Sequence, residues 1–112
     1  MKKQILLIIT ATVLSTSALA GGNHFHPKKI AKCSGACTEE QIKAAVPGAI
    51  TYLADWKRID TAWAKAKIEG VAKKDFKKGP EWVVTLKNEA NEIRYLFFGL
   101  DGYVTGSNST GE

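Results

Sequence analysis

The sequence contains few of the residues that most often build metal, redox and nucleophilic sites. It has two cysteines, two histidines and one methionine among its 112 residues. Two cysteines permit at most one intramolecular disulfide bond. Neither a serine nor a cysteine lies beside a histidine in a pattern that suggests an activated nucleophile. We therefore expect a protein without catalytic residues.

Long apolar runs are also scarce. The longest is an almost unbroken run over residues 5–13, which follows two lysines and precedes the small residues Ala-Leu-Ala at positions 18–20. This stretch is shorter than the ~20 apolar residues that a membrane-spanning helix needs. A basic start, an apolar run and a small-residue cleavage site are typical of a secretory signal peptide. We predict a signal peptide over residues 1–20 and no transmembrane segment after its cleavage.

The basic excess of the chain is local. The net charge is +5, and it falls to +3 when Lys2 and Lys3 leave with the signal peptide. The remaining excess lies in two segments, residues 28–32 and residues 65–78. The exported chain is therefore only mildly basic, and a charged contact is expected in one of these segments.

The second segment contains a dense run of lysines around Phe76, namely Lys73, Lys74, Lys77 and Lys78. Such a run often belongs to a solvated hairpin that keeps a sheet edge from pairing with another chain. The alternative is a contact with an anionic partner, either an envelope protein or an anionic surface. An exported chain without a pattern of stacking aromatic residues is not expected to bind nucleic acid.

Residues 21–37 have the composition of a flexible tail that ends in a cysteine loop. The tail opens with two glycines, is interrupted by Pro27, and lacks the apolar periodicity of a helix or strand. Because exported proteins fold in an oxidising compartment, Cys33 and Cys37 are predicted to form a disulfide bond, a local staple before the first helix. Three residues separate the two cysteines, one more than in the usual redox pair, so a redox dithiol is the less favoured interpretation.

The same segment offers an alternative function, the binding of Cu or Zn. Its candidate ligands are the soft or borderline donors of residues 21–112, namely His24, His26, Cys33 and Cys37. Two imidazoles and two thiolates suit a tetrahedral site for Zn²⁺ or Cu⁺. A disulfide bond would remove two of these ligands, so the disulfide and the metal site exclude one another.

Residues 38–112 have the pattern of one α+β domain. Thr38 and Gln41 form a capping-box motif at a helix start. The apolar residues after it recur at helical spacing: Ile42, Ala45, Val46, Ala49, Ile50 and Leu53. Four strands are predicted next, over residues 66–76, 81–87, 93–100 and 103–107.

The connections between these strands define the predicted topology. Asp101-Gly102, between the last two strands, is a strong hairpin signal. Short loops between consecutive strands require antiparallel pairing. The sequence therefore predicts an N-terminal helix packed on one face of a four-stranded antiparallel meander sheet.

This pattern resembles the PepSY family of small exported modules. The resemblance lies in the amphipathic helix at residues 44–50, the charged strand at 67–75, Trp82-Val83-Val84, and the closing hairpin at 95–104. Residues 27–37 and 78–82 are similar to an uncharacterised PepSY-like group from Gram-negative bacteria.

The resemblance implies a PepSY-like domain over residues 38–112, located in the periplasm and without catalytic residues. The leading interpretation is a binding or interaction module of unknown partner. The alternative is a periplasmic metal-binding protein that uses the His/Cys segment.

Overall fold

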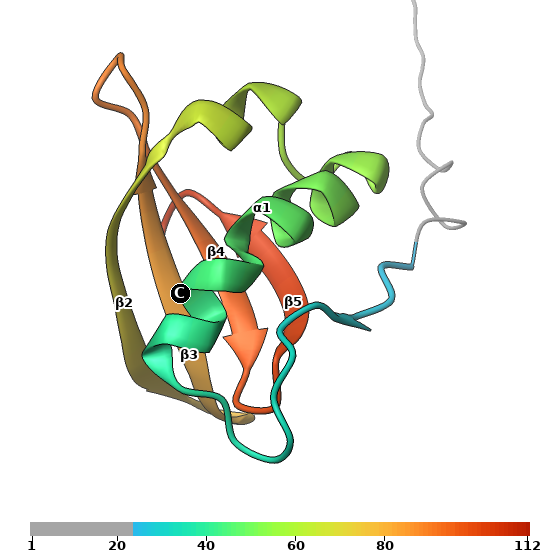
Figure 1. Ribbon diagram of the computed structural model, residues 1–112. Coiled ribbons are helices and arrows are strands. Elements are labelled where there is room, and N and C mark those ends of the chain that lie inside the picture. Colours follow the sequence, from blue (N-terminus) through green and yellow to red (C-terminus); the bar gives the residue numbers. More distant parts are fainter. Residues whose placement is uncertain (1–23) are drawn as a thin grey trace, which may run out of the picture.

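A computed structural model describes residues 24–112 as a sheet with an α-helix packed across it (Figure 1). The predicted signal peptide, residues 1–20, lies outside the described residues. In chain order the elements are β1 (Lys28–Lys29), α1 (Glu39–Asp55), the 3-10 helix η2 (Thr61–Lys65), β2 (Lys67–Phe76), β3 (Gly79–Lys87), β4 (Ile93–Gly99) and β5 (Tyr103–Asn108). The strands are antiparallel in the order β1-β5-β4-β3-β2. The predicted α+β class is confirmed.

Helix α1 begins where the sequence predicts, because Thr38 caps it. The Thr38 Oγ1 atom accepts a hydrogen bond from the Gln41 amide at 3.2 Å, and the Thr38 amide donates to Gln41 Oε1 at 2.8 Å. The side chain of each residue thereby accepts a hydrogen bond from the backbone amide of the other. None of the helices within residues 24–112 has the length and hydropathy needed to cross a bilayer.

The core lies between α1 and one face of the sheet, here called the helix face. The helix buries the apolar stripe that the sequence predicts: Ile42, Ala45, Val46, Ala49, Ile50 and Leu53. The sheet contributes large side chains from its central strands and β5: Trp82, Val84, Leu86, Leu96, Phe98 and Val104. Burial of a side chain of this size contributes about 1.5–3 kcal/mol. This layer is the main source of stability.

The sheet has five strands, where the sequence predicts four. The additional strand, β1, lies in the predicted tail and pairs with β5, with Lys28 opposite Val104 and Lys29 opposite Tyr103. The amides of Ile30 and Ala31 then donate to the Gly102 carbonyl at 3.0 and 3.2 Å. β1 covers the hydrogen-bonding edge that β5 would otherwise expose. Its two lysines give no strand pattern, which is why the four-strand count was too low.

The turn between β4 and β5 holds this N-terminal segment in place. The Cys37 amide donates to the Leu100 carbonyl at 2.8 Å. Gly102 has a φ of +96°, and a Cβ atom there would lie 2.9 Å from the Ala31 Cβ atom and 3.0 Å from the Cys37 Sγ atom. Glycine is therefore required at this position both by the backbone angle and by the close approach of residues 31–37.

Replacing Gly102 with alanine is predicted to destabilise the fold more than the same change at Gly35. Both glycines have a left-handed φ, +96° and +82°, so each change costs roughly 1–2 kcal/mol of backbone strain. A Cβ atom at Gly35 meets nothing within 4 Å, whereas one at Gly102 adds about 1–3 kcal/mol of overpacking. Urea unfolding measures the difference. Equal losses at the two sites would contradict the close packing of residues 31–37 on the turn.

Candidate functional site

The side of the sheet turned away from α1, here called the open face, has an apolar patch of its own. Cross-strand partners share a face of an antiparallel sheet, and Val83 lies opposite both Ala72 on β2 and Phe97 on β4. Val83 is 6% exposed and Phe97 is 7% exposed, yet neither belongs to the core cluster that contains α1. The two central strands are therefore apolar on both faces.

Phe76 and Tyr95 extend this patch. The Phe76 ring at the end of β2 meets the Phe97 ring edge-on, with the ring centroids 5.8 Å apart. Tyr95 precedes Phe97 by two residues on β4 and so lies on the same face. The Nζ atom of Lys74 lies 5.7 Å from the centroid of the Phe76 ring, close enough for a cation–π contact. An apolar floor thus has a lysine at its β2 side.

Residues 109–112, here called the strap, turn back from β5 over the open face. The Asn108 side chain fixes this turn, because its Oδ1 atom accepts hydrogen bonds from the amides of Thr110 and Gly111 at 3.1 and 2.8 Å. Its Nδ2 atom donates to the Glu112 carbonyl at 3.1 Å. In Figure 1, which views the sheet from the helix side, the mark of the C-terminal end overlaps β3.

Within the described residues, Gly111 is the strap residue that contacts β4 and β2. It is buried, it has a φ of +80°, and a Cβ atom there would lie 3.3 Å from the Tyr95 ring. The Gly111 carbonyl accepts a hydrogen bond from the Lys74 Nζ atom at 3.0 Å. The strap therefore reaches from β5 to β2, across the two central strands.

Two hollows lie on the open face, and residues of the strap line both. The larger has a volume of about 460 Å³, has Phe76 and Phe97 on its floor, and is bordered by Lys77, Lys78 and Glu112. The smaller has a volume of about 330 Å³ and is lined by Val83, Tyr95, Lys74, Thr110 and Gly111, among others. An apolar floor with a few charged groups at the rim is a common form of binding site.

The four lysines of the predicted partner site do not lie on one face. Lys73 is opposite Trp82 on the helix face, with its Nζ atom 5.3 Å from the Trp82 ring centroid. Lys74 is on the open face, while Lys77 and Lys78 form the β2–β3 turn beside the larger hollow. Three of the four lysines are thus placed around the open face.

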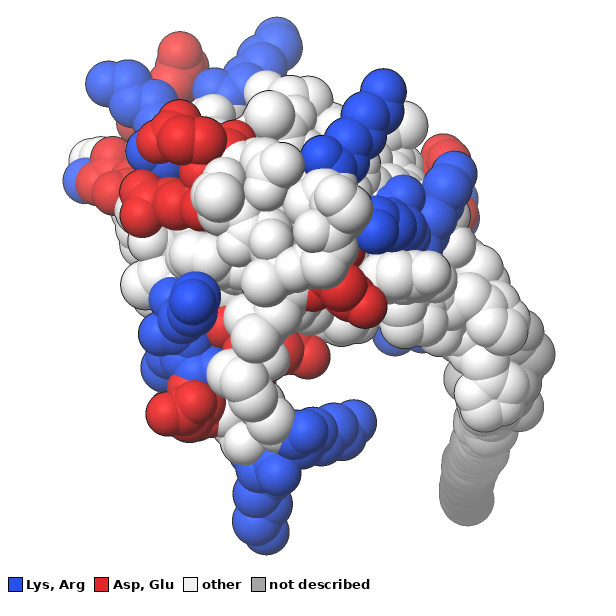
Figure 2. Space-filling view, turned by 60° about the horizontal axis from the view of Figure 1, so that its bottom comes forward, with Lys and Arg blue, Asp and Glu red and all other residues white. Residues whose placement is uncertain are grey.

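Charge on the molecule is mixed. In the view of Figure 2, basic and acidic side chains alternate around an uncharged area, and no broad field of one sign is visible. Glu81 also lines the larger hollow. It lies opposite Lys74 in the register of β2 and β3, and so on the same face of the sheet. The lysines therefore act as individual groups at the rim of the open face.

The predicted metal ligands are not assembled into a site. The His26 ring meets the Trp56 ring edge-on at a centroid distance of 5.4 Å, and the His26 carbonyl accepts a hydrogen bond from the Tyr52 hydroxyl at 2.8 Å. Cys33 and Cys37 are bonded to each other. Over residues 24–112, no group of three or more His, Cys, Asp or Glu residues is placed to hold an ion.

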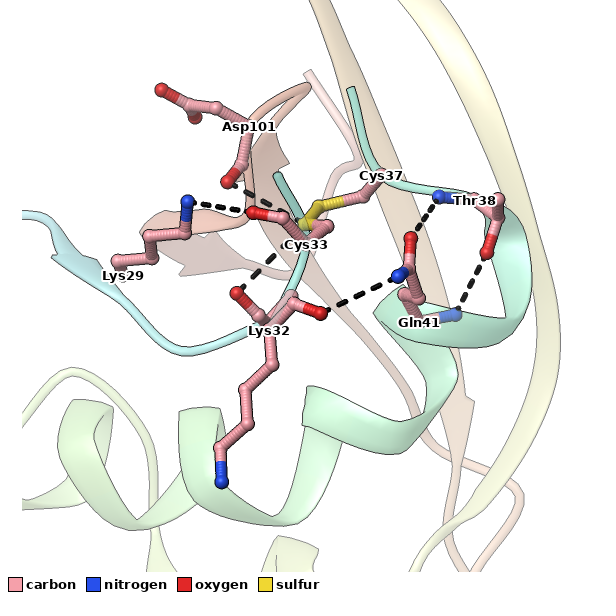
Figure 3. Close-up of a disulfide and its surroundings, with 8 residues drawn as sticks. Lys29, Lys32, Cys33, Cys37, Thr38, Gln41 and Asp101 are labelled. Carbon is pink, nitrogen blue, oxygen red and sulfur yellow. Dashed lines mark hydrogen bonds between the residues drawn. A yellow bond between two sulfur atoms is a disulfide. The ribbon is translucent and has the colours of Figure 1, made fainter. Parts of the chain in front are cut away.

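The disulfide between Cys33 and Cys37 joins Cα atoms 5.3 Å apart and connects β1 to the start of α1. Figure 3 shows its surroundings. Lys29 Nζ donates to the Cys33 carbonyl at 2.8 Å, and Gln41 Nε2 donates to the Lys32 carbonyl at 3.3 Å. Both cysteines are buried and belong to the core cluster. The helix cap and the disulfide loop are therefore one connected unit.

The apolar patch on the open face was not predicted from the sequence, although one sequence pattern indicates it. The runs Trp82-Val83-Val84 and Leu96-Phe97-Phe98 are continuously apolar. Strands with apolar residues on both sides give such runs, whereas strands with one solvated face alternate. The strap had no comparable signal, because its residues are small and polar.

A family model described as a family of unknown function (DUF6488) matches residues 1–112. No curated protein and no solved structure matches the chain. The family description assigns no activity, ligand or partner.

Protein purified without reductant is predicted to contain no free thiols after denaturation, as measured with a thiol-reactive dye. Replacing both cysteines with alanine is expected to lower the free energy of unfolding by about 2 kcal/mol, the entropy expected for closing so short a loop. Reductant should destabilise the native protein and leave this double variant unchanged.

The same preparations distinguish the disulfide from the metal site. Added Zn²⁺ or Cu⁺ is expected to leave the Tm of the oxidised protein unchanged, because a disulfide offers no thiolate ligands. Two reactive thiols together with one bound metal ion per chain would contradict the disulfide and favour the metal site.

Proposed function

The chain belongs to the DUF6488 family, whose function is unknown, and we propose that it is a non-catalytic binding module of the periplasm. In this proposal the open face receives an extended, acidic segment of an envelope protein. The signal-peptide pattern of residues 1–20 supports export. The resemblance to PepSY modules belongs to the same proposal, since those modules also act by interaction.

The observation that supports this function most directly is the second apolar patch. An antiparallel sheet with helix on one side commonly presents polar residues on the other. Here Val83 and Phe97 occupy that side, and within the described residues the strap crosses it, in contact with Tyr95 and Lys74. A hollowed apolar patch with a polar rim is typical of an interaction site.

The lysines at the rim favour an acidic partner. Lys74, Lys77 and Lys78 contribute three positive charges around the two hollows, against two side-chain carboxylates, those of Glu81 and of Glu112 in the strap. Exposed charges of this kind add modest affinity, up to about 1 kcal/mol per pair. Their larger effect is on the orientation and rate of association with a partner of opposite charge.

A protein segment is favoured over an anionic lipid surface. A membrane surface attracts clusters of basic residues, whereas the lysines here have acidic neighbours, with Glu81 opposite Lys74 and Glu112 lining the larger hollow. A stretch of polypeptide, the strap, already lies over the open face. Both features support a polypeptide ligand.

Photo-crosslinking in living cells tests this function. A photoreactive amino acid in place of Lys77, beside the larger hollow, is expected to form an adduct with an envelope protein. The same amino acid in place of Lys65, an exposed residue at the end of η2, is the matched control and is expected to form no such adduct.

Charge variants sharpen this test. In the Lys77 photoreactive background, Lys78→Gln should lower the adduct yield roughly twofold, since an exposed lysine contributes about 0.5 kcal/mol. Lys74 is left in place because it also holds the strap. Lys65→Gln removes the same charge and should have no effect. An unchanged yield with Lys78→Gln, or adhesion of the purified protein to anionic lipid vesicles without a protein adduct, would reject the proposal.

A further inference from the structure

We infer that the strap, residues 109–112, is an internal competitor that occupies the place of the partner segment on the open face. This inference rests on the proposed function and specifies it. The partner segment displaces the strap and repeats its contacts with the sheet. The ligand is thus an extended polypeptide segment in which a glycine is followed by an acidic residue.

The contacts of the strap are few and easily replaced. Within the described residues, its contacts with strands other than β5 are one hydrogen bond, from Lys74 Nζ to the Gly111 carbonyl at 3.0 Å, and the packing of Gly111 on the Tyr95 ring. Ser109, Thr110 and Glu112 are exposed. A chain segment that offers the same carbonyl and the same small residue can therefore take the position of the strap.

The requirement for glycine follows from the Tyr95 ring. A Cβ atom at position 111 would lie 3.3 to 3.4 Å from three carbon atoms of that ring, and the φ of +80° disfavours other residues. Any segment that follows the path of the strap meets the same ring. A larger side chain at this point would press against the ring, which would have to shift by a few tenths of an ångström, and would have to adopt a left-handed backbone angle.

The preference for an acidic residue follows from the larger hollow. Glu112 lines this hollow together with Lys77 and Lys78. An acidic residue directly after the glycine therefore enters a region with two lysines at its border. Because these lysines are exposed, the contribution to affinity is modest and depends on salt.

Displacement of the strap also changes the shape of the face. The strap residues Thr110 and Gly111 line the smaller hollow, and Glu112 lines the larger one. Removal of these residues opens both hollows toward each other along Val83 and Phe97. The tethered strap has a high effective concentration at this place, so a free segment competes poorly until the strap is loosened.

The test uses the full chain and a synthetic peptide with the sequence of residues 108–112, Asn-Ser-Thr-Gly-Glu, as the probe. Asn108→Ala loosens the strap by removing its three side-chain hydrogen bonds. Gly111→Val loosens it by a different route, through the tight contact with Tyr95 and the left-handed φ of +80°, and serves if the first variant folds poorly. Ser109→Ala changes an exposed strap residue and is the matched control.

Peptide binding is followed by the backbone NMR signals of Val83, Tyr95 and Phe97. We expect both loosened variants to bind the peptide with an apparent Kd about tenfold lower than that of the wild-type protein and of Ser109→Ala, as for a site that the strap closes nine-tenths of the time. A peptide with valine in place of glycine should not bind. Adding Lys74→Gln to a loosened variant should weaken binding about two- to fivefold.

Two results would overturn the inference. If the wild-type protein binds the peptide as tightly as the loosened variants do, the strap does not compete, although the open face would still be a binding site. If neither loosened variant binds the peptide, the strap does not mark the path of a ligand. The crosslinking experiment uses protein with a wild-type strap, so it tests the proposed function independently of both results.

Discussion

The central strands β3 and β4 carry apolar side chains on both faces, and burying both faces would require a packed layer on each side. Helix α1 supplies the layer on one side. Phe98 and Val84 point into the core beneath the helix, while Phe97 and Val83 point to the other side. The pleat of a strand makes this division unavoidable, since successive residues lie on opposite faces. The described chain places no second helix against the open face. The hollows, the lysines at the rim and the strap all lie on the apolar face that the single helix leaves unpacked.

The sheet edges are better protected than the open face. β1 covers β5, and it is held there by hydrogen bonds to the β4–β5 turn and by the disulfide loop that packs on Gly102. At the opposite edge, β2 has a bulge at Glu69 and a largely charged sequence. Bulges and charges both oppose pairing with another strand. A partner that added a strand to β2 would have to overcome both, which leaves the open face as the more accessible surface for a polypeptide ligand.

The features that the sequence predicted are those with local causes. The capping box of Thr38 and Gln41, the helical stripe and the Asp101-Gly102 turn each depend on residues within a few positions of one another, and all three are present. β1 and the strap depend on distant segments instead, through the pairing of Lys28 with Val104 and the hydrogen bond between Lys74 and Gly111. Short segments of lysine, glycine and serine have no periodicity, so such contacts leave no local signal.

The composition of the strap distinguishes a temporary cover from a permanent one. A layer that stabilised the fold would bury apolar side chains, at about 25 cal/mol for each Å² removed from water. The strap offers serine, threonine, glycine and glutamate, and only its glycine is buried. It therefore borders the hollows beside Val83 and Phe97 while contributing little apolar area of its own. A partner segment that adds apolar contacts in the two hollows gains free energy that the strap never supplied, and this difference is what makes displacement favourable.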